Sequence, residues 1–200
     1  NQVQGFPDPA TTDGEASHPD GFREAIQRLP HPGIVIVATP DHLHAPVILA
    51  AVEAGHHVIV EKPLCLKVAE AHQIAQAANS SAAYVLTDYH KRHDPAIRGA
   101  KYKFGQGKLG EMLHGHAWIE ERREIPLKYF ASWCDQSSPF EYIGVHYVDA
   151  YYFITGLKPR RLAAFGQKKL LPKHGKDAFD AVQAVVEWDD GSVLWVQTAW

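Results

Sequence analysis

The stretch that decides the fold is Val35-Ile36-Val37-Ala38-Thr39-Pro40-Asp41-His42-Leu43-His44, followed about one short helix later by Val58-Ile59-Val60-Glu61-Lys62-Pro63. Each half is an apolar, β-branched run that stops at a polar turn, which is the pattern of a buried parallel strand. Ligands bind at the carboxyl edge of open parallel sheets. The polar side chains expected at that edge are Thr39, His44, Glu61 and Lys62.

The pattern of the chain changes near residue 87. Before it, strand–helix–strand–helix–strand spacing from about residue 33 predicts right-handed parallel crossovers and half of a doubly wound sheet. After it, alternating apolar and polar residues predict strands, and one long apolar pattern predicts a helix over 140–155. The later strands are expected at residues 112–122, 161–167, 179–188 and 192–200. The sequence therefore predicts a parallel α/β part followed by an α+β part with an antiparallel sheet.

Composition excludes several classes of function. The chain has 200 residues, a net charge of -3 and 46% hydrophobic residues, so neither a nucleic acid nor a membrane surface is an expected partner. Cys65 and Cys134 form no CxxC pair, which favours a reducing, cytoplasmic location. No run is long and apolar enough to span a bilayer. The paired histidines have no further ligands at fitting spacing, so no metal site is expected.

Two features indicate a fragment of a longer protein. The first part supplies only three parallel strands, and no Gly-rich phosphate loop is found. The chain also ends at Trp200, inside an apolar strand, which leaves a strand edge without cover. We therefore expect this chain alone to bind a dinucleotide poorly or not at all.

Five motifs, in order and at matching spacing from about residue 22 to residue 200, carry a family resemblance. They are Ala38-Thr39-Pro40-Asp41-His42-Leu43-His44, Ala54-Gly55-His56-His57-Val58, Glu61-Lys62-Pro63, Arg92-His93-Asp94-Pro95 and Gly144-Val145-His146-Tyr147-Val148-Asp149. Together they resemble the glucose–fructose oxidoreductase / inositol dehydrogenase / MocA (Gfo/Idh/MocA) oxidoreductase family. The resemblance implies a fold class of α/β: the C-terminal part of a Rossmann-type parallel sheet, then an α+β domain with an open, mostly antiparallel sheet.

The resemblance also implies domain roles and cofactor contacts. Residues 1–90 would be a partial dinucleotide-binding domain for NAD or NADP, and residues 91–200 a partial substrate-binding and oligomerisation domain. The residues implied to contact the cofactor are Thr39, Pro40, His44, Glu61, Lys62 and Pro63. Asp41 stands where the family has Asn. Lys62 would project between nicotinamide and substrate, and a cis Lys62–Pro63 bond would fix its direction.

The last motif matches the family less completely. It usually places an acidic residue four positions before the catalytic histidine, on the same helix face. Here His146 matches, but Tyr142 holds that position, and Glu141 would point about 100° away on a regular helix. Tyr142 would therefore face the substrate together with His146. Arg92 is a further candidate for substrate binding, with an ion pair inside the fold as the alternative.

These residues predict an NAD(P)-dependent dehydrogenase. It would transfer hydride between nicotinamide and a sugar, cyclitol or related polyol, with His146 as base and Lys62 as stabiliser of the alkoxide. A homo-oligomer through the antiparallel sheet is also expected. Two other functions stay open: an NAD-dependent glycoside hydrolase of the same family, and a non-catalytic binding or assembly module without the phosphate loop. The choice between NAD and NADP and the identity of the substrate stay open as well.

Overall fold

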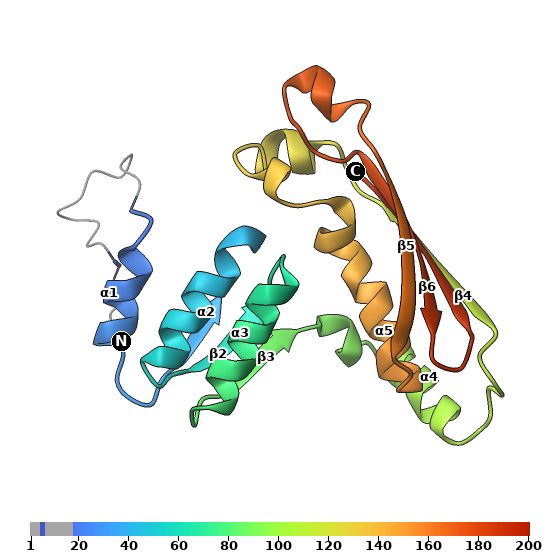
Figure 1. Cartoon of the computed structure of the whole chain (residues 1–200), viewed down its shortest axis with the longest axis horizontal. Helices are drawn as coiled ribbons and strands as arrows, with labels where there is room; N and C mark the ends of the chain where they lie inside the picture. Colours follow the sequence, from blue (N-terminus) through green and yellow to red (C-terminus); the bar gives the residue numbers. More distant parts are fainter. Residues whose placement is uncertain (1–4, 7–17) are drawn as a thin grey trace. The chain divides into compact units, whose positions relative to one another are not determined.

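The computed structural model describes Gly5, Phe6 and residues 18–200 (Figure 1). The chain divides into two compact units, residues 1–88 and Tyr89–Trp200. The roles predicted for residues 1–90 and 91–200, cofactor binding and substrate binding, stay predictions. Among the described residues, no helix has both the length and the apolar character needed to cross a membrane.

The first unit is built around a three-stranded parallel sheet with the strand order β1-β2-β3. The strands are β1 (Ile34–Val37), β2 (His57–Glu61) and β3 (Val85–Asp88). The helices are α1 (Gly21–Arg28), α2 (His44–Glu53), which follows a 3-10 turn η1 (Asp41–Leu43), and α3 (Val68–Asn79). This arrangement confirms the predicted Rossmann-type parallel sheet.

All three helices contribute to a single core on one face of this sheet. Ile26 of α1, Ile48 of α2 and Ile74 of α3 join the buried strand residues, such as Val37 and Val60, in one cluster. On the other face Ile34, Ile36 and Leu86 are 59%, 72% and 59% exposed. The prediction of a buried strand therefore holds for only one face of β1, because side chains alternate along a strand and the described helices cover one face of the sheet.

Gly55 and His56 lie at the amino-terminal edge of the same sheet, just before β2. Gly55 follows α2 with φ +77, and a Cβ atom there would lie 2.4 Å from His31 Nε2. His56 is buried; its Nδ1 accepts a hydrogen bond from the Gly33 N–H at 3.0 Å, and its Nε2 lies 3.1 Å from the Ile26 carbonyl. Because Nδ1 is an acceptor, Nε2 carries the proton and donates. His56 thus joins α1 to the start of β1.

The second unit contains a four-stranded sheet with the order β4-β7-β6-β5. Its strands are β4 (His114–Glu120), β5 (Pro159–Gln167), β6 (Ala181–Trp188) and β7 (Val193–Ala199), and its helices are α4 (Pro95–Gly105) and α5 (Val145–Thr155). The β5–β6 and β6–β7 pairs are antiparallel, whereas β4 and β7 are parallel. The predicted open, mostly antiparallel sheet is confirmed, with one parallel pair that the sequence did not predict.

Helix α5 packs on the buried face of this sheet. Tyr151 of α5 stacks on Trp188 of β6 with ring centroids 4.6 Å apart, and Leu194 and Val196 of β7 complete the cluster. The opposite face follows the alternation of β7, where Trp195 is 55% exposed. The core of the unit therefore lies between α5 and one face of the sheet.

The segment before α5 is not a regular α-helix. Phe140–Gly144 (η5) is π-helical and leads directly into Val145 at the start of α5. The prediction of one helix over 140–155 is therefore wrong in its first turn. Phe140 packs closely over Gly144, where an added Cβ would lie 2.7 Å from Phe140 Cδ2. A second π-helical segment, Ile125–Tyr129 (η3), was not predicted.

Candidate active site

Two turns that follow β1 and β2 carry the predicted cofactor residues. Because the two strands pair in parallel, both turns lie at the same edge of the sheet. Thr39 and Pro40 follow β1, Glu61 is the last residue of β2, and Lys62 and Pro63 come next. The Lys62–Pro63 peptide bond is cis, as predicted. The structure thus brings these five residues to one sheet edge, and their contacts with a cofactor stay predictions.

His44 begins α2 and is only 1% exposed. Its Nδ1 lies 2.7 Å from the Pro63 carbonyl oxygen, and its Nε2 lies 2.9 Å from the Thr39 carbonyl oxygen. The ring therefore spans from the turn after β1 to the turn after β2. Both ring nitrogens contact the main chain, while the predicted contact between His44 and the cofactor stays a prediction.

His146 is the second residue of α5 and is 2% exposed. Its ring packs against two residues at the start of the same unit. The centroid of His90 is 4.5 Å away with the rings edge to face, and the centroid of Tyr89 is 6.2 Å away. These ring contacts restrict the orientation of the imidazole. The role of His146 as a base stays a prediction.

Tyr142 and Glu141 lie side by side in the sequence but have different surroundings. The Tyr142 ring contacts Phe130 at 5.1 Å and Trp200 at 5.4 Å between centroids. Glu141 lines a groove of about 550 Å³ together with Lys168, with both polar and apolar side chains in its walls. The angle of about 100° expected between the two side chains does not apply, because a π-helical turn contains more residues than an α-turn. The substrate contact predicted for Tyr142 stays a prediction.

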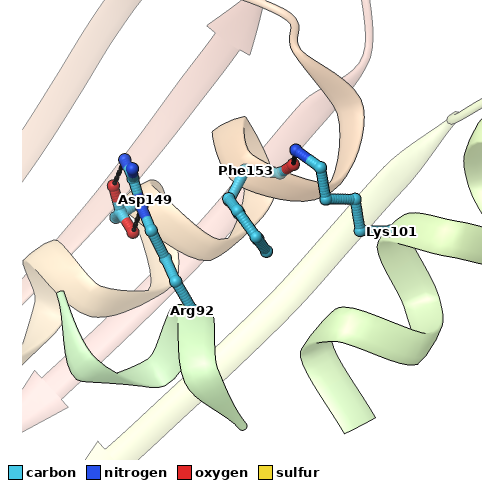
Figure 2. Close-up of polar contacts among 4 residues, drawn as sticks. All are labelled: Arg92, Lys101, Asp149 and Phe153. Carbon is cyan, nitrogen blue, oxygen red and sulfur yellow. Dashed lines mark hydrogen bonds and ion pairs between the residues drawn. The ribbon is translucent and has the colours of Figure 1, made fainter. Parts of the chain in front are cut away.

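Arg92 forms a two-pronged ion pair with Asp149 (Figure 2). Its Nε donates to Asp149 Oδ2 at 2.8 Å and its Nη2 to Oδ1 at 2.5 Å. The guanidinium also lies over the rings of Tyr89 and Phe153, at 5.5 and 5.4 Å from their centroids. The hydrogen bond to Asp149 raises the pKa of Arg92 above its usual value. The ion pair proposed as the alternative is present, and a substrate contact of Arg92 stays a prediction.

Comparison with known proteins establishes the family. A model described as an oxidoreductase family with an NAD-binding Rossmann fold matches residues 8–89, and the GFO/IDH/MocA C-terminal domain matches residues 97–200. The chain belongs to the Gfo/Idh/MocA oxidoreductase family. The resemblance drawn from the five sequence motifs is thereby confirmed, and the two matches together cover both structural units.

Individual members of the Gfo/Idh/MocA family are similar over different parts of the chain. The 1,5-anhydro-D-fructose reductase of Ensifer adhaerens is 26% identical over 171 residues, 80% of this chain and 48% of the reductase. A glycosyl hydrolase family 109 protein of Shewanella pealeana is 32% identical over 122 residues, 60% of this chain and 26% of that protein. The crystal structure of an inositol dehydrogenase homolog from Azotobacter vinelandii, complexed with NADH and myo-inositol, matches with a TM-score of 0.78 and 25% identity, over 90% of this chain and 48% of that one. The chain thus spans half or less of the length of these relatives.

The Gfo/Idh/MocA assignment confirms a nicotinamide dinucleotide as the family cofactor. Thr39 and Lys62 lie at the carboxyl edge of the parallel sheet, where such a cofactor is predicted to bind. A phosphate-binding fingerprint must follow a strand and open a helix. Gly105, Gly107 and Gly110 have the spacing GxGxxG, but they follow α4 and precede β4, so their context is the reverse. This GxGxxG run therefore does not have the context of a phosphate-binding fingerprint, and the contacts of this chain with a dinucleotide stay predictions.

Sequence reasoning missed the contacts that surround the candidate groups of the second unit. Asp149 belongs to the same motif as His146, but its pairing with Arg92 joins residues 57 positions apart. The only local signal was that Asp149 lies three residues after His146, on the same face of a helix. The packing of His90 on His146 has no signal in the sequence. Among the described residues, no group of three or more His, Cys, Asp or Glu is arranged to hold a metal ion.

Proposed function

We propose that the protein containing this chain is an NAD(P)-dependent dehydrogenase acting on a sugar, cyclitol or related polyol. The observation that carries the proposal is a Gfo/Idh/MocA chain with Glu61-Lys62-Pro63 at the carboxyl edge of its parallel sheet. Relatives named for 1,5-anhydro-D-fructose reduction and solved with myo-inositol support this substrate class. Hydroxyl-bearing carbons are common to both.

His146 and Lys62 are proposed to act on the substrate hydroxyl in two different ways. Bound nicotinamide supplies the hydride transfer. His146 takes the hydroxyl proton during oxidation, a role worth roughly 10²- to 10⁴-fold in rate. The Lys62 ammonium stabilises the negative charge that develops on the oxygen.

The other candidate residues are proposed to bind the cofactor or the substrate and to take no part in the chemical step. Thr39, Pro40, His44, Glu61 and Pro63 are the proposed cofactor contacts. Tyr142 offers a hydroxyl that can hydrogen-bond a sugar, and it is a poor base near neutral pH. Arg92 donates two N–H groups to Asp149, so the other three of its five donors are what it can offer to a substrate.

A dehydrogenase screen tests the function. The natural polypeptide that contains this sequence is assayed against a panel of polyols and sugars with NAD and with NADP, following reduced nicotinamide by absorbance. We expect turnover with at least one polyol and a preference for one of the two cofactors. A polypeptide that binds a dinucleotide but oxidises or reduces none of these compounds contradicts the proposal.

Glycoside hydrolysis is the second candidate. It is favoured by the relative named as a glycosyl hydrolase family 109 protein, which matches 60% of this chain. In this scheme a tightly held NAD is reduced and reoxidised within each turnover, so no net NADH appears. Product analysis with an aryl glycoside separates the two functions, since only hydrolysis releases the phenol without consuming added NAD.

Assembly and location are also proposals. We propose a homo-oligomer formed through the open face of the β4–β7–β6–β5 sheet, supported by the exposure of Trp118 (62%), Trp195 (55%) and Phe165 (65%). Sedimentation of the wild type and of Trp195→Glu tests it, and a monomeric wild type contradicts it. The free thiols of Cys65 and Cys134 support a cytoplasmic location.

A further inference from the structure

We propose that His44 is a positioning residue for Lys62, because its imidazole ties the turn after β1 to the turn after β2. The inference rests on the proposed function, since the position of Lys62 affects turnover only if Lys62 stabilises the alkoxide. It differs from the cofactor contact predicted for His44 from the sequence.

The link is made inside the first unit and is shielded from water. His44 is 1% exposed, with its ring nitrogens 2.7 Å from the Pro63 carbonyl oxygen and 2.9 Å from the Thr39 carbonyl oxygen. A main-chain carbonyl shielded from water is costly when it lacks a donor. A neutral ring supplies that donor to one of the two carbonyls, at turns where the β1–β2 ladder has ended.

This link bears on Lys62 because the main chain on both sides of that residue is held. Glu61, on the amino side, pairs with Asp88 of β3 as the last residue of β2. Pro63, on the carboxyl side, is buried, and its carbonyl contacts His44. Loss of the His44 link leaves only one of these two anchors. A shift of about 1 Å in a reacting group can cost about 100-fold in rate.

The number of N–H donors that a side chain offers to the two carbonyl oxygens decides which residues can replace His44. Both partners are acceptors, and a neutral imidazole carries one N–H, so each tautomer donates to one carbonyl; a protonated ring donates to both. A Gln side chain keeps N–H donors on a single nitrogen, whereas Ala has none. His44→Gln therefore keeps part of the link, and His44→Ala removes it.

The same unit offers a matched control in His56. It is 2% exposed and also bonds the main chain through both ring nitrogens, at Gly33 and Ile26. It immediately precedes β2, however, so it lies at the opposite edge of the sheet from Lys62. Alanine at either position removes a buried ring and its main-chain contacts, but only His44 contacts the turn that contains Lys62.

The first measurement is amide hydrogen exchange in the natural polypeptide that contains this sequence, without cofactor. We expect His44→Ala to speed exchange at the Lys62 and Leu64 amides at least about tenfold, because the turn opens locally when one anchor is lost. His56→Ala is expected to leave both amides within about twofold of the wild type, although it lowers Tm to a similar extent.

The second measurement is a double-mutant cycle on turnover. His44→Ala is expected to lower kcat by about 10- to 100-fold. In a Lys62→Ala background the same change lowers kcat by less than about threefold, because no ammonium is left to position. His44→Gln falls between the wild type and His44→Ala. His56→Ala keeps kcat within about threefold of the wild type, since it does not contact this turn.

Two results overturn the proposal. One is equal exchange at Lys62 and Leu64 in His44→Ala and His56→Ala; the other is the same kcat loss from His44→Ala with and without Lys62. If His44→Ala does not fold, His44→Gln and His56→Gln give the same comparison. If Lys62→Ala keeps full turnover, the proposed function fails, and the exchange data alone decide whether His44 holds the turn.

Discussion

In residues 18–88 the candidate groups lie in the turns after β1 and β2 or, for His44, at the first residue of α2. In residues 89–200 they lie in three helical segments that pack against distant parts of the chain, around Arg92, Tyr142 and His146. His44 reaches Thr39 and Pro63, 5 and 19 positions away. Arg92 reaches Asp149 across 57 positions. The first arrangement follows from local pattern and strand order, while the second depends on how the whole unit packs.

The largest expected effect concerns the two groups proposed to react. In the natural polypeptide that contains this sequence, His146→Ala and Lys62→Ala are each expected to lower kcat by about 10²- to 10⁴-fold, because one removes the base and the other the alkoxide stabiliser. Steady-state kinetics measures the loss, and calorimetric titration of the dinucleotide is expected to change little. If only one of the two substitutions affects turnover, the division of the chemistry between the two regions is wrong.

Next in size is the long-range ion pair of the second unit. Asp149 is 8% exposed and Arg92 36% exposed, so Arg92→Ala leaves a largely buried carboxylate without its partner. The expected loss is about 2–3 kcal/mol in the free energy of unfolding, measured by urea denaturation. Lys101→Ala is the control, because Lys101 forms no ion pair with the residues that the structure describes and makes an exposed hydrogen bond to the Phe153 carbonyl at 2.8 Å, with its ammonium 4.0 Å from the Phe153 ring centroid (Figure 2). Equal losses of unfolding free energy in Arg92→Ala and Lys101→Ala would show that the Arg92–Asp149 ion pair contributes no extra stability.

A smaller, pH-dependent effect on stability is expected at Asp180. Its carboxylate accepts hydrogen bonds from the main chain of residues 169–171, in the loop after β5. Burial alone would raise the pKa of Asp180, but hydrogen bonds from the Leu171, Lys169 and Leu170 N–H groups together lower it below its usual value. The carboxylate therefore stabilises the fold fully above its unfolded pKa of about 3.9, and this stabilisation is lost as the pH falls through the lower native value.

Asp180→Asn tests this pH dependence. At pH 7 the substitution is expected to cost about 1–2 kcal/mol, because an amide oxygen accepts these bonds more weakly than a carboxylate. The difference from the wild type should shrink towards pH 2 in chemical denaturation curves. A difference that stays constant from pH 7 to pH 2 is incompatible with a role for the ionised carboxylate.

The smallest effect belongs to the surface pair of Arg161 and Glu187. Arg161 is 76% exposed, so Arg161→Ala is expected to change the free energy of unfolding by less than about 0.5 kcal/mol. The change should vanish in about 0.5 M salt, where exposed charges are screened. A larger loss that persists in salt would contradict this prediction, because it would show that this exposed ion pair contributes more to stability than its exposure indicates.

The sequence was most informative where structure depends on neighbouring residues. The runs that end at Thr39 and Glu61 predicted parallel strands, and the Glu61-Lys62-Pro63 motif predicted the cis bond, because strand pattern and turn chemistry are local properties. The parallel pairing of β4 with β7 was not predictable in this way, because it joins segments that are separated by α5, β5 and β6. The exposed face of β1 was missed for a similar reason, since apolar character does not say which face a helix covers.

The candidate site shows the same limit. The motif around His146 placed the residue correctly on a helix, but assumed regular geometry for the residues before it. Phe140–Gly144 is π-helical instead, with the Phe140 ring packed closely over Gly144. The pairing of Arg92 with Asp149 and the packing of His90 against His146 come from tertiary structure, so no local pattern predicts them.

The π-helical turn before α5 has a consequence for how this helix can change by insertion and deletion. A turn of this kind holds one residue more than the α-turn it replaces. Removing Ile143 would allow an α-turn to form and would shift each preceding residue one place nearer to His146. Glu141 would then lie four positions before His146, where Tyr142 lies now. A single-codon deletion would thus replace the phenol at this spacing by a carboxylate without any substitution.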